Sequence, residues 1–125
     1  MILAVSCSVV VDDEAAFRRQ AGRLLAIRGF SVVGEAADAS EALRTARALE
    51  PRAAVVDVSL PDRSGLELAG ELLQLRAAPR VLLTSADAEV GAEELRRCGA
   101  IGFVPKDQLP TSDLTALLTG SGEES

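Results

Sequence analysis

The sequence contains no histidine, tryptophan or tyrosine, and only 2% of its 125 residues are aromatic. The hydrophobic core must therefore consist mainly of Val, Leu, Ile and Ala side chains. The two cysteines, Cys7 and Cys98, lack the spacing of metal-ligand motifs, and without histidine they argue against a zinc site. We expect both to be buried or half-buried free thiols of a cytosolic protein.

Basic residues are scarce, with 13 Lys and Arg against 19 Asp and Glu and a net charge of −6. This balance argues against binding to a nucleic-acid backbone, which requires clustered cations, and favours partners with basic patches or metal cations. The apolar residues 1–11 are too short to span a membrane, and they lack the basic region of a signal peptide. We predict that they contain a strand and that the protein does not enter a membrane.

Short apolar runs alternate with longer amphipathic stretches along the chain. The runs predict strands at residues 5–11, 31–34, 53–57, 80–85 and 101–104. The amphipathic stretches predict helices at residues 15–28, 41–49, 66–75, 89–98 and 110–118. We expect one domain over residues 1–119, followed at residues 120–125 by a polar tail or the start of a linker.

This alternation predicts an α/β fold, a doubly wound five-stranded parallel sheet with helices on both faces. Five strands fit the flavodoxin-like order 2-1-3-4-5. Parallel strands end at one edge of the sheet, so the polar residues that end or follow each strand should gather there. These residues are three acids, two hydroxyls and one ammonium: Asp12, Asp13, Asp57, Thr84, Ser85 and Lys106.

Converging carboxylates repel one another unless a cation lies among them, and an oxygen-only ligand set in a half-open site fits Mg²⁺. Lys106 is the only lysine, whereas the other twelve basic residues are arginines. A metal ion and a compact ammonium would neutralise a transferring phosphoryl group, and a hydroxyl would bind a further oxygen. The central carboxylate, Asp57, would then be the nucleophile and form an aspartyl phosphate.

At this point the chain resembles the receiver domain of two-component response regulators, over about residues 5–118. The resemblance rests on the strand-end residues already named and on four others: Leu60, Pro61, Gly65 and Phe103. It implies that Asp57 accepts a phosphoryl group from a histidine kinase. It also implies that Lys106 pairs with Asp57 or its phosphate, that Thr84 moves to bind the phosphate, and that Phe103 occupies an aromatic switch position.

The resemblance further implies that Asp13, Asp57 and the Ser59 backbone carbonyl ligate Mg²⁺, with Asp12 acting through water. Residues 102–107 look most like receivers that precede helix-turn-helix transcription factors. The resemblance thus implies a cytoplasmic, transcription-regulating module that binds DNA only through an output domain outside this chain. It also implies no enzyme activity beyond its own phosphorylation and dephosphorylation.

Self-association through the helix at 89–98, the strand at 101–104 and the helix at 110–118 is expected of a switch of this kind. Arg96 and Arg97 could pair there with the glutamates of a second copy, or could be part of a solvated face. Proline precedes Lys106, where many receivers have it after the lysine, so the isomer of the Lys106–Asp107 bond stays open. Phe103 lacks the hydroxyl of the more common tyrosine.

Several alternatives remain from the residues alone. Asp12 and Asp13 could merely cap a helix. A receiver-like interaction domain that is never phosphorylated is one other function. An aspartyl-phosphate phosphatase is another, although it needs a second acid two residues after the nucleophile, where this chain has Ser59. The chain is either a stand-alone receiver or a fragment, and we expect Asp62 and Glu14 to be solvated.

Overall fold

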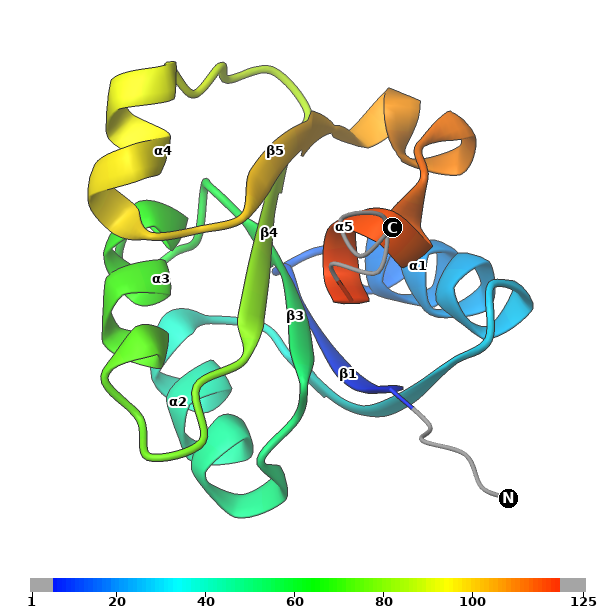
Figure 1. Cartoon of the computed structure of the whole chain (residues 1–125), viewed down its shortest axis with the longest axis horizontal. Helices are drawn as coiled ribbons and strands as arrows, with labels where there is room; N and C mark the ends of the chain where they lie inside the picture. The colour runs from blue at the N-terminus through cyan, green and yellow to red at the C-terminus, as the bar shows by residue number, and fades with distance from the viewer. Residues whose placement is uncertain (1–5, 120–125) are drawn as a thin grey trace.

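The computed structural model describes residues 6–119, and it contains one sheet of five parallel strands in the order β2-β1-β3-β4-β5 (Figure 1). The strands are β1 (Ser6–Val11), β2 (Phe30–Ala36), β3 (Ala53–Asp57), β4 (Arg80–Ser85) and β5 (Gly102–Pro105). The predicted fold class and strand order are therefore confirmed. Residue 5 of the first predicted strand and the predicted tail at 120–125 lie outside the described residues.

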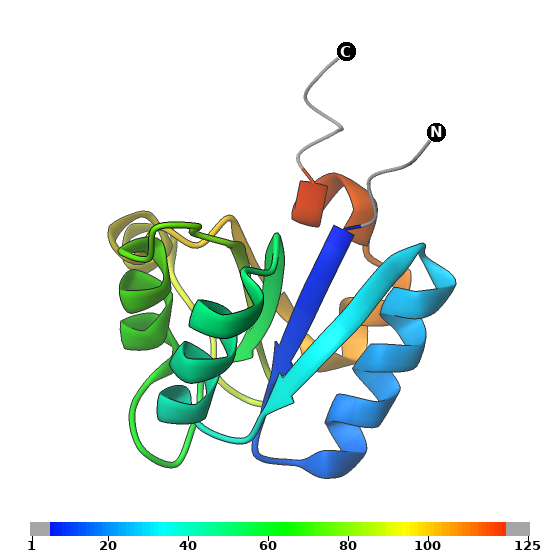
Figure 2. The ribbon, with the colours of Figure 1, turned by 90° about the horizontal axis from the view of Figure 1, so that it is seen from below.

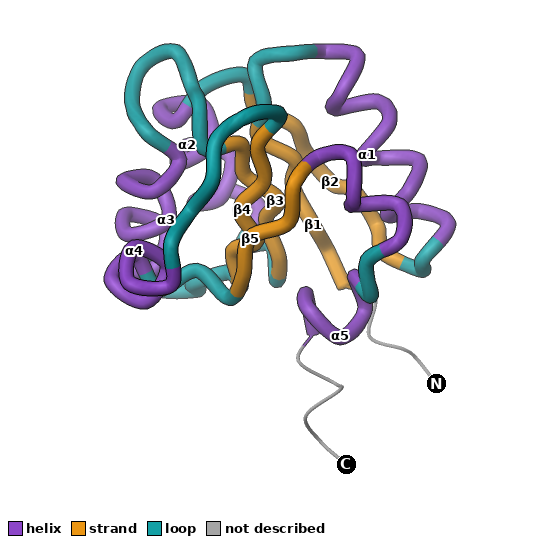
Figure 3. Tube along the Cα trace, turned by 90° about the horizontal axis from the view of Figure 1, so that it is seen from above, coloured by secondary structure: helices purple, strands orange, loops and turns teal. Residues whose placement is uncertain are grey.

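Helices cover both faces of the sheet. Figure 1 shows α1 (Ala15–Ile27) and α5 (Leu114–Thr119) on one face, and α2 (Ala39–Leu49), α3 (Gly65–Leu73) and α4 (Ala92–Cys98) on the other. The strands form the central layer between these two groups of helices (Figure 3). A short 3₁₀ helix, η1 (Lys106–Thr111), joins β5 to α5.

Side chains of the inner strands alternate between the two helical layers. In β1, Val9 and Val11 pack in the cluster that includes α2 and α3, whereas Val10 packs in the cluster of α1, η1 and α5. Both faces are covered, which is why these strands are continuous apolar runs in the sequence. β1 also pairs in parallel with the edge strand β2, and Figure 2 shows the two strands running to the same edge.

The helix predictions at 15–28, 41–49 and 66–75 are each within two residues of the structure at either end, whereas the other two helix predictions differ more. The helix predicted at 89–98 begins only at Ala92, where the Glu94 carboxylate accepts a hydrogen bond from the Gly91 amide at 3.1 Å. The helix predicted at 110–118 is instead two elements, because the 3₁₀ turn around Pro110 ends at Thr111 and α5 starts at Leu114. The backbone is extended at Ser112, and the Asp113 carboxylate then accepts a hydrogen bond from the Ala116 amide at 3.1 Å, which begins a new helix.

The strand predictions differ by a few residues. β2 extends from 30 to 36 because its last residues pair with the end of β1, and β5 includes Pro105 opposite Ser85. β5 is an edge strand, where proline is tolerated. All peptide bonds of the described residues are trans, including Lys106–Asp107.

Two expectations about the rest of the chain can also be compared with the structure. Cys7 and Cys98 are half-buried and form no disulfide within the described residues, as predicted. Within residues 6–119, none of the helices combines the length and the apolar character that crossing a membrane requires.

The first turn of α3 lies against the end of β3. The Gly65 amide donates a hydrogen bond to the Val58 carbonyl at 2.8 Å, and a Cβ atom on Gly65 would lie 2.2 Å from the Asp57 carbonyl oxygen. The Ser64 hydroxyl accepts from the Leu66 amide at 2.9 Å, which fixes where α3 begins. Gly65 is therefore required for the close approach of α3 to Asp57.

We predict that Gly65→Ala lowers the free energy of unfolding by about 1–3 kcal/mol, because the new methyl group overlaps backbone atoms. Gly70 is the matched control, since it lies in the same helix with no atom within 4 Å of its Cβ position. Gly70→Ala should stabilise by about 0.5–1 kcal/mol through helix propensity. Urea unfolding of both variants tests this, and equal effects would contradict the role of Gly65.

Candidate functional site

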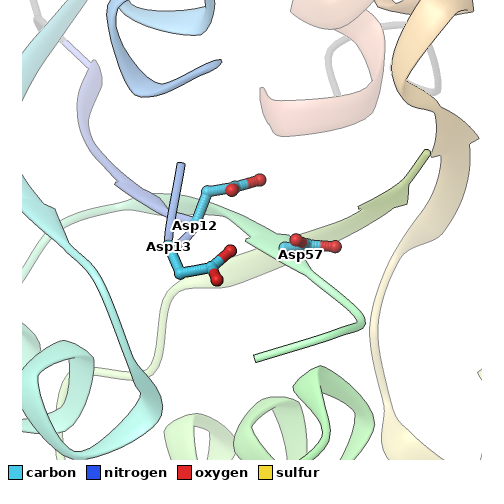
Figure 4. Close-up of side chains that lie close together, drawn as sticks. All are labelled: Asp12, Asp13 and Asp57. Carbon is cyan, nitrogen blue, oxygen red and sulfur yellow. The ribbon is translucent and has the colours of Figure 1, made fainter. Parts of the chain in front are cut away.

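The strand register brings three carboxylates together at the carboxyl edge of the sheet. Val11 of β1 pairs with Val56 of β3, so Asp12 follows directly beside Asp57. The carboxylates of Asp12, Asp13 and Asp57 each offer an oxygen within 4.8 Å of the others. Figure 4 shows them at the ends of β1 and β3. Asp12 is fully buried, Asp57 is 5% exposed, and Asp13 faces solvent.

Within the described residues, Lys106 is the one cationic side chain that forms ion pairs with these carboxylates. Its Nζ lies 2.7 Å from Asp12 Oδ2, 3.6 Å from Asp57 Oδ2 and 3.6 Å from Glu14 Oε1. Lys106 reaches this place because β5 pairs with β4 up to Pro105 and the chain then turns into η1. Glu14 is thus a neighbour of the lysine, although its carboxylate is largely exposed, as expected.

Burial raises the pKa of Asp57 from 3.8 to about 6. The hydrogen bond from the Ser59 amide to Asp57 Oδ1, at 3.2 Å, lowers this pKa, while the charge of Asp12 raises it and the charge of Lys106 lowers it. The Ser59 hydrogen bond and the Lys106 charge therefore offset only part of the pKa increase that burial of Asp57 causes. Such a group is typical of a functional site.

Burial by itself lowers the pKa of Lys106, but acidic neighbours outweigh that effect. The hydrogen bond and charge of Asp12, together with the charges of Asp57 and Glu14, raise the pKa of Lys106 above its ordinary value. The side chain is therefore a permanent ammonium ion at neutral pH. A single positive charge faces several acids here, so the cluster keeps an excess of negative charge.

The donor set fits a hard divalent cation. All the side-chain ligands offered are carboxylate oxygens, and the exposed Asp13 leaves the site open to water. Mg²⁺ prefers one or two carboxylates and keeps several waters, which matches an open acidic pocket of this kind. Ser59, the predicted backbone ligand, follows β3 by two residues, and its amide is bonded to Asp57.

The two hydroxyls at the end of β4 differ in their surroundings. Thr84 pairs with Asp57 in the sheet, and its hydroxyl is buried without a hydrogen-bond partner among the described residues. A buried unpartnered hydroxyl is costly, so it points to a ligand that completes it. Ser85 instead accepts hydrogen bonds from the amides of Asp87 and Ala88, at 3.4 and 3.0 Å, and shapes the loop.

Phe103, the predicted switch aromatic, lies in β5 opposite Leu83 of β4. Its side chain is half-buried and packs against the apolar cluster beneath α2, α3 and α4. Phe103 is therefore one position along the paired strands from Thr84, and its side chain packs in the apolar cluster and not among the carboxylates. The charged residues of α4 pair within their own helix, since Glu93 contacts both Arg96 and Arg97.

Asp62 is exposed to solvent, as expected, but its carboxylate also makes contacts that the sequence does not predict. Its carboxylate accepts hydrogen bonds from the amides of Ala39 at 2.9 Å and Ser40 at 3.0 Å, in the first turn of α2. These bonds lower the pKa of Asp62 to about 2. The contact ties the loop after Asp57 to a helix 23 residues earlier in the chain, and no local sequence signal reports it.

Two residues of α1 were also missed as parts of the site. Arg18 donates to the Asp12 carbonyl at 2.6 Å and to Glu35 Oε1 at 2.9 Å, so it fastens the loop after β1 to the end of β2. Phe17 presents its ring to the Lys106 ammonium, with the ring centroid 4.3 Å from Nζ. In the sequence, both residues read only as members of an amphipathic helix.

The chain is similar along most of its length to known receiver domains. The family model described as the response regulator receiver domain matches residues 9–119. The transcriptional regulatory protein PdtaR of Mycobacterium tuberculosis is 32% identical over 111 residues, which cover 85% of this chain and 54% of PdtaR. The probable transcriptional regulatory protein NarL of the same species is 36% identical over 112 residues, covering 88% of this chain and 52% of NarL.

A solved structure agrees with these matches. The signal receiver domain of the putative response regulator NarL from M. tuberculosis has a TM-score of 0.84 at 31% identity, covering 98% of this chain and 100% of that chain. The chain spans about half the length of PdtaR and NarL.

We predict that Asp57→Asn stabilises the metal-free protein at neutral pH. Because the pKa of Asp57 is higher in the folded protein, folding favours the protonated carboxyl. The stability that Asp57 contributes is therefore fully present below pH 3.8 and is lost as the pH rises through about 6. In EDTA the variant should therefore be about 2 kcal/mol more stable than wild type at pH 7.5 and equally stable at about pH 3. Urea unfolding between these pH values measures the difference, and a gap that does not vary with pH would contradict it.

Proposed function

The chain belongs to the receiver-domain family of two-component response regulators, and from this premise we propose that Asp57 is its phospho-acceptor. In this proposal a histidine kinase supplies the phosphoryl group, Mg²⁺ is required, and the module acts in the cytoplasm. The observation that carries the proposal is the position of Asp57, a buried carboxylate beside two other acids. The Lys106 ammonium lies near one of its oxygens, and the next strand brings the Thr84 hydroxyl, which has no hydrogen-bond partner among residues 6–119.

Asp13, Asp57 and the Ser59 carbonyl would hold the metal ion, and Asp12 would act on it through water. When bound, Mg²⁺ supplies charge neutralisation for the phosphoryl oxygens and for the acid cluster. The acidic cluster supports this assignment because its oxygens converge and because the nearby ammonium leaves negative charge uncompensated.

The protein's own residues have distinct parts in the transfer. The Ser59 amide engages Asp57 Oδ1, which leaves Oδ2 as the oxygen nearer Lys106 and suited to attack phosphorus. The bond from phosphorus to the kinase histidine nitrogen breaks as the bond to the Asp57 oxygen forms, giving an acyl phosphate. Lys106 would pair with the new phosphate, and Thr84 would donate its hydroxyl hydrogen to a phosphate oxygen.

Output would come from a partner or from an attached domain. PdtaR and NarL are named as transcriptional regulators, and this chain covers about half of each, so a DNA-binding output outside this chain is part of the proposal. Thr84 and Phe103 would switch together, and phosphorylation would shift a two-state equilibrium of the β4–α5 region. We place self-association on the surface of α4, β5 and α5.

We predict that Mg²⁺ and acetyl phosphate together give a single phosphate adduct, seen by intact mass spectrometry. The adduct should be absent with Asp57→Ala or with EDTA, because the nucleophile or the neutralising cation is then missing. Asp113→Asn, which removes an exposed carboxylate before α5, is the control that should keep the adduct. An adduct that survives Asp57→Ala would refute the assignment of the acceptor.

We also predict that Thr84→Val separates stability from phosphate binding. Without a phosphate mimic the variant should be as stable as wild type, or about 1 kcal/mol more stable, because a buried unpartnered hydroxyl is removed. With Mg²⁺ and beryllofluoride, wild type and Thr84→Ser should gain more in melting temperature than Thr84→Val. Equal gains for all three proteins would show that the hydroxyl does not reach the phosphate.

A further inference from the structure

One aromatic ring completes the surroundings of the Lys106 ammonium. Phe17 on α1 lies with its ring centroid 4.3 Å from Nζ, well inside the distance of about 6 Å at which a cation is attracted to a ring face. Phe17 is one of three phenylalanines in the chain. Its side chain is buried, and it belongs to the apolar cluster between the sheet, α1, η1 and α5.

The lysine side chain does not by itself fix the position of its ammonium. Lysine has a flexible stem, and its ammonium is strongly hydrated, so nothing in the side chain itself fixes its position. Nζ forms a short contact with Asp12 but lies 3.6 Å from Asp57 Oδ2, which is beyond an ordinary hydrogen bond. The lysine is thus held close to the acceptor without being bonded to it.

The carboxylates do not surround the Lys106 ammonium on all sides. Phe17 and Lys106 line a cavity of about 330 Å³ between α1 and η1, together with Gln20, Leu109 and Pro110. Without the ring, this cavity would give the ammonium an alternative, hydrated position away from Asp57. An aliphatic side chain would fill the same apolar space but has no negatively polarised face for a cation.

We propose that Phe17 is a positioning residue that holds the Lys106 ammonium between Asp12 and Asp57 through a cation–π contact. The proposal rests on the proposed function for its consequence, which is that the contact sets the rate of phosphoryl transfer to Asp57. The contact itself is independent of that function and can be measured separately.

The single lysine makes the contact directly observable. Protein labelled with ¹³C-lysine gives one Cε–Hε signal, that of Lys106, and a proton over a ring face resonates upfield of its random-coil position. Wild type and Phe17→Tyr should show the upfield signal, and Phe17→Leu should lose it. Phe30→Leu is the matched control, because Phe30 is buried in the same apolar cluster, whereas the ring under the lysine ammonium is that of Phe17.

The rate of phosphorylation by acetyl phosphate is the second readout. Phe17→Leu should be slower than wild type by about threefold or more, the size expected of a cation–π contact, while Phe17→Tyr and Phe30→Leu stay within about twofold. If Phe17→Leu does not fold, Phe17→Met provides the same comparison with an unbranched apolar side chain. The dissociation constant of Mg²⁺ should change less than the rate, because the metal ligands are retained.

Each result decides the proposal. An unshifted lysine signal in wild type, or one that persists in Phe17→Leu, overturns it. Equal slowing by Phe17→Leu and Phe30→Leu also overturns it, since a general loss of packing would then be the cause. If wild type shows the shifted signal but accepts no phosphate, the proposed function fails. The cation–π contact between Phe17 and Lys106 is then confirmed without a role in phosphoryl transfer.

Discussion

The candidate site depends above all on the ion pair between Lys106 and Asp12. Asp12 is fully buried, and an isolated buried carboxylate is costly, so the ammonium at 2.7 Å makes its burial tolerable. The same ammonium lies 3.6 Å from Asp57 Oδ2. Burial nevertheless raises the pKa of Asp57 to about 6. One positive charge is too little for the whole cluster, which explains why the site suits a divalent cation.

The scaffold fixes the loops that carry these charges. Arg18 fastens the segment after β1 by its bond to the Asp12 carbonyl. Gly65 lets α3 approach the Asp57 backbone, and Asp62 anchors the following loop to the first turn of α2. Most of these contacts involve backbone atoms, so they determine where the site residues lie and leave the side chains of the site free for chemistry.

The fold could be predicted from the sequence because each inner strand has an apolar run that reaches both faces of the sheet and is followed directly by a polar residue. The same property identified Asp12, Asp57 and Thr84, since parallel strands end at one edge. Lys106 was identified because it follows the last strand and is the only lysine. The sequence did not reveal the bonds of Asp62 to α2 or the contact of Phe17 with Lys106, because these join residues far apart in the chain through the directions of their side chains. The break between η1 and α5 was missed because apolar spacing continues across it, although the backbone is extended at Ser112.

The central claim is that the Asp57 carboxylate, and no other, forms the acyl phosphate. The most direct measurement is to treat the phosphorylated protein with borohydride, which reduces an acyl phosphate and converts the aspartate to homoserine, and then to sequence its peptides by tandem mass spectrometry. We predict that homoserine appears at position 57 alone and only when Mg²⁺ was present during phosphorylation. Homoserine at position 12 or 13, or the same yield in EDTA, would contradict the assignment of acceptor and metal site.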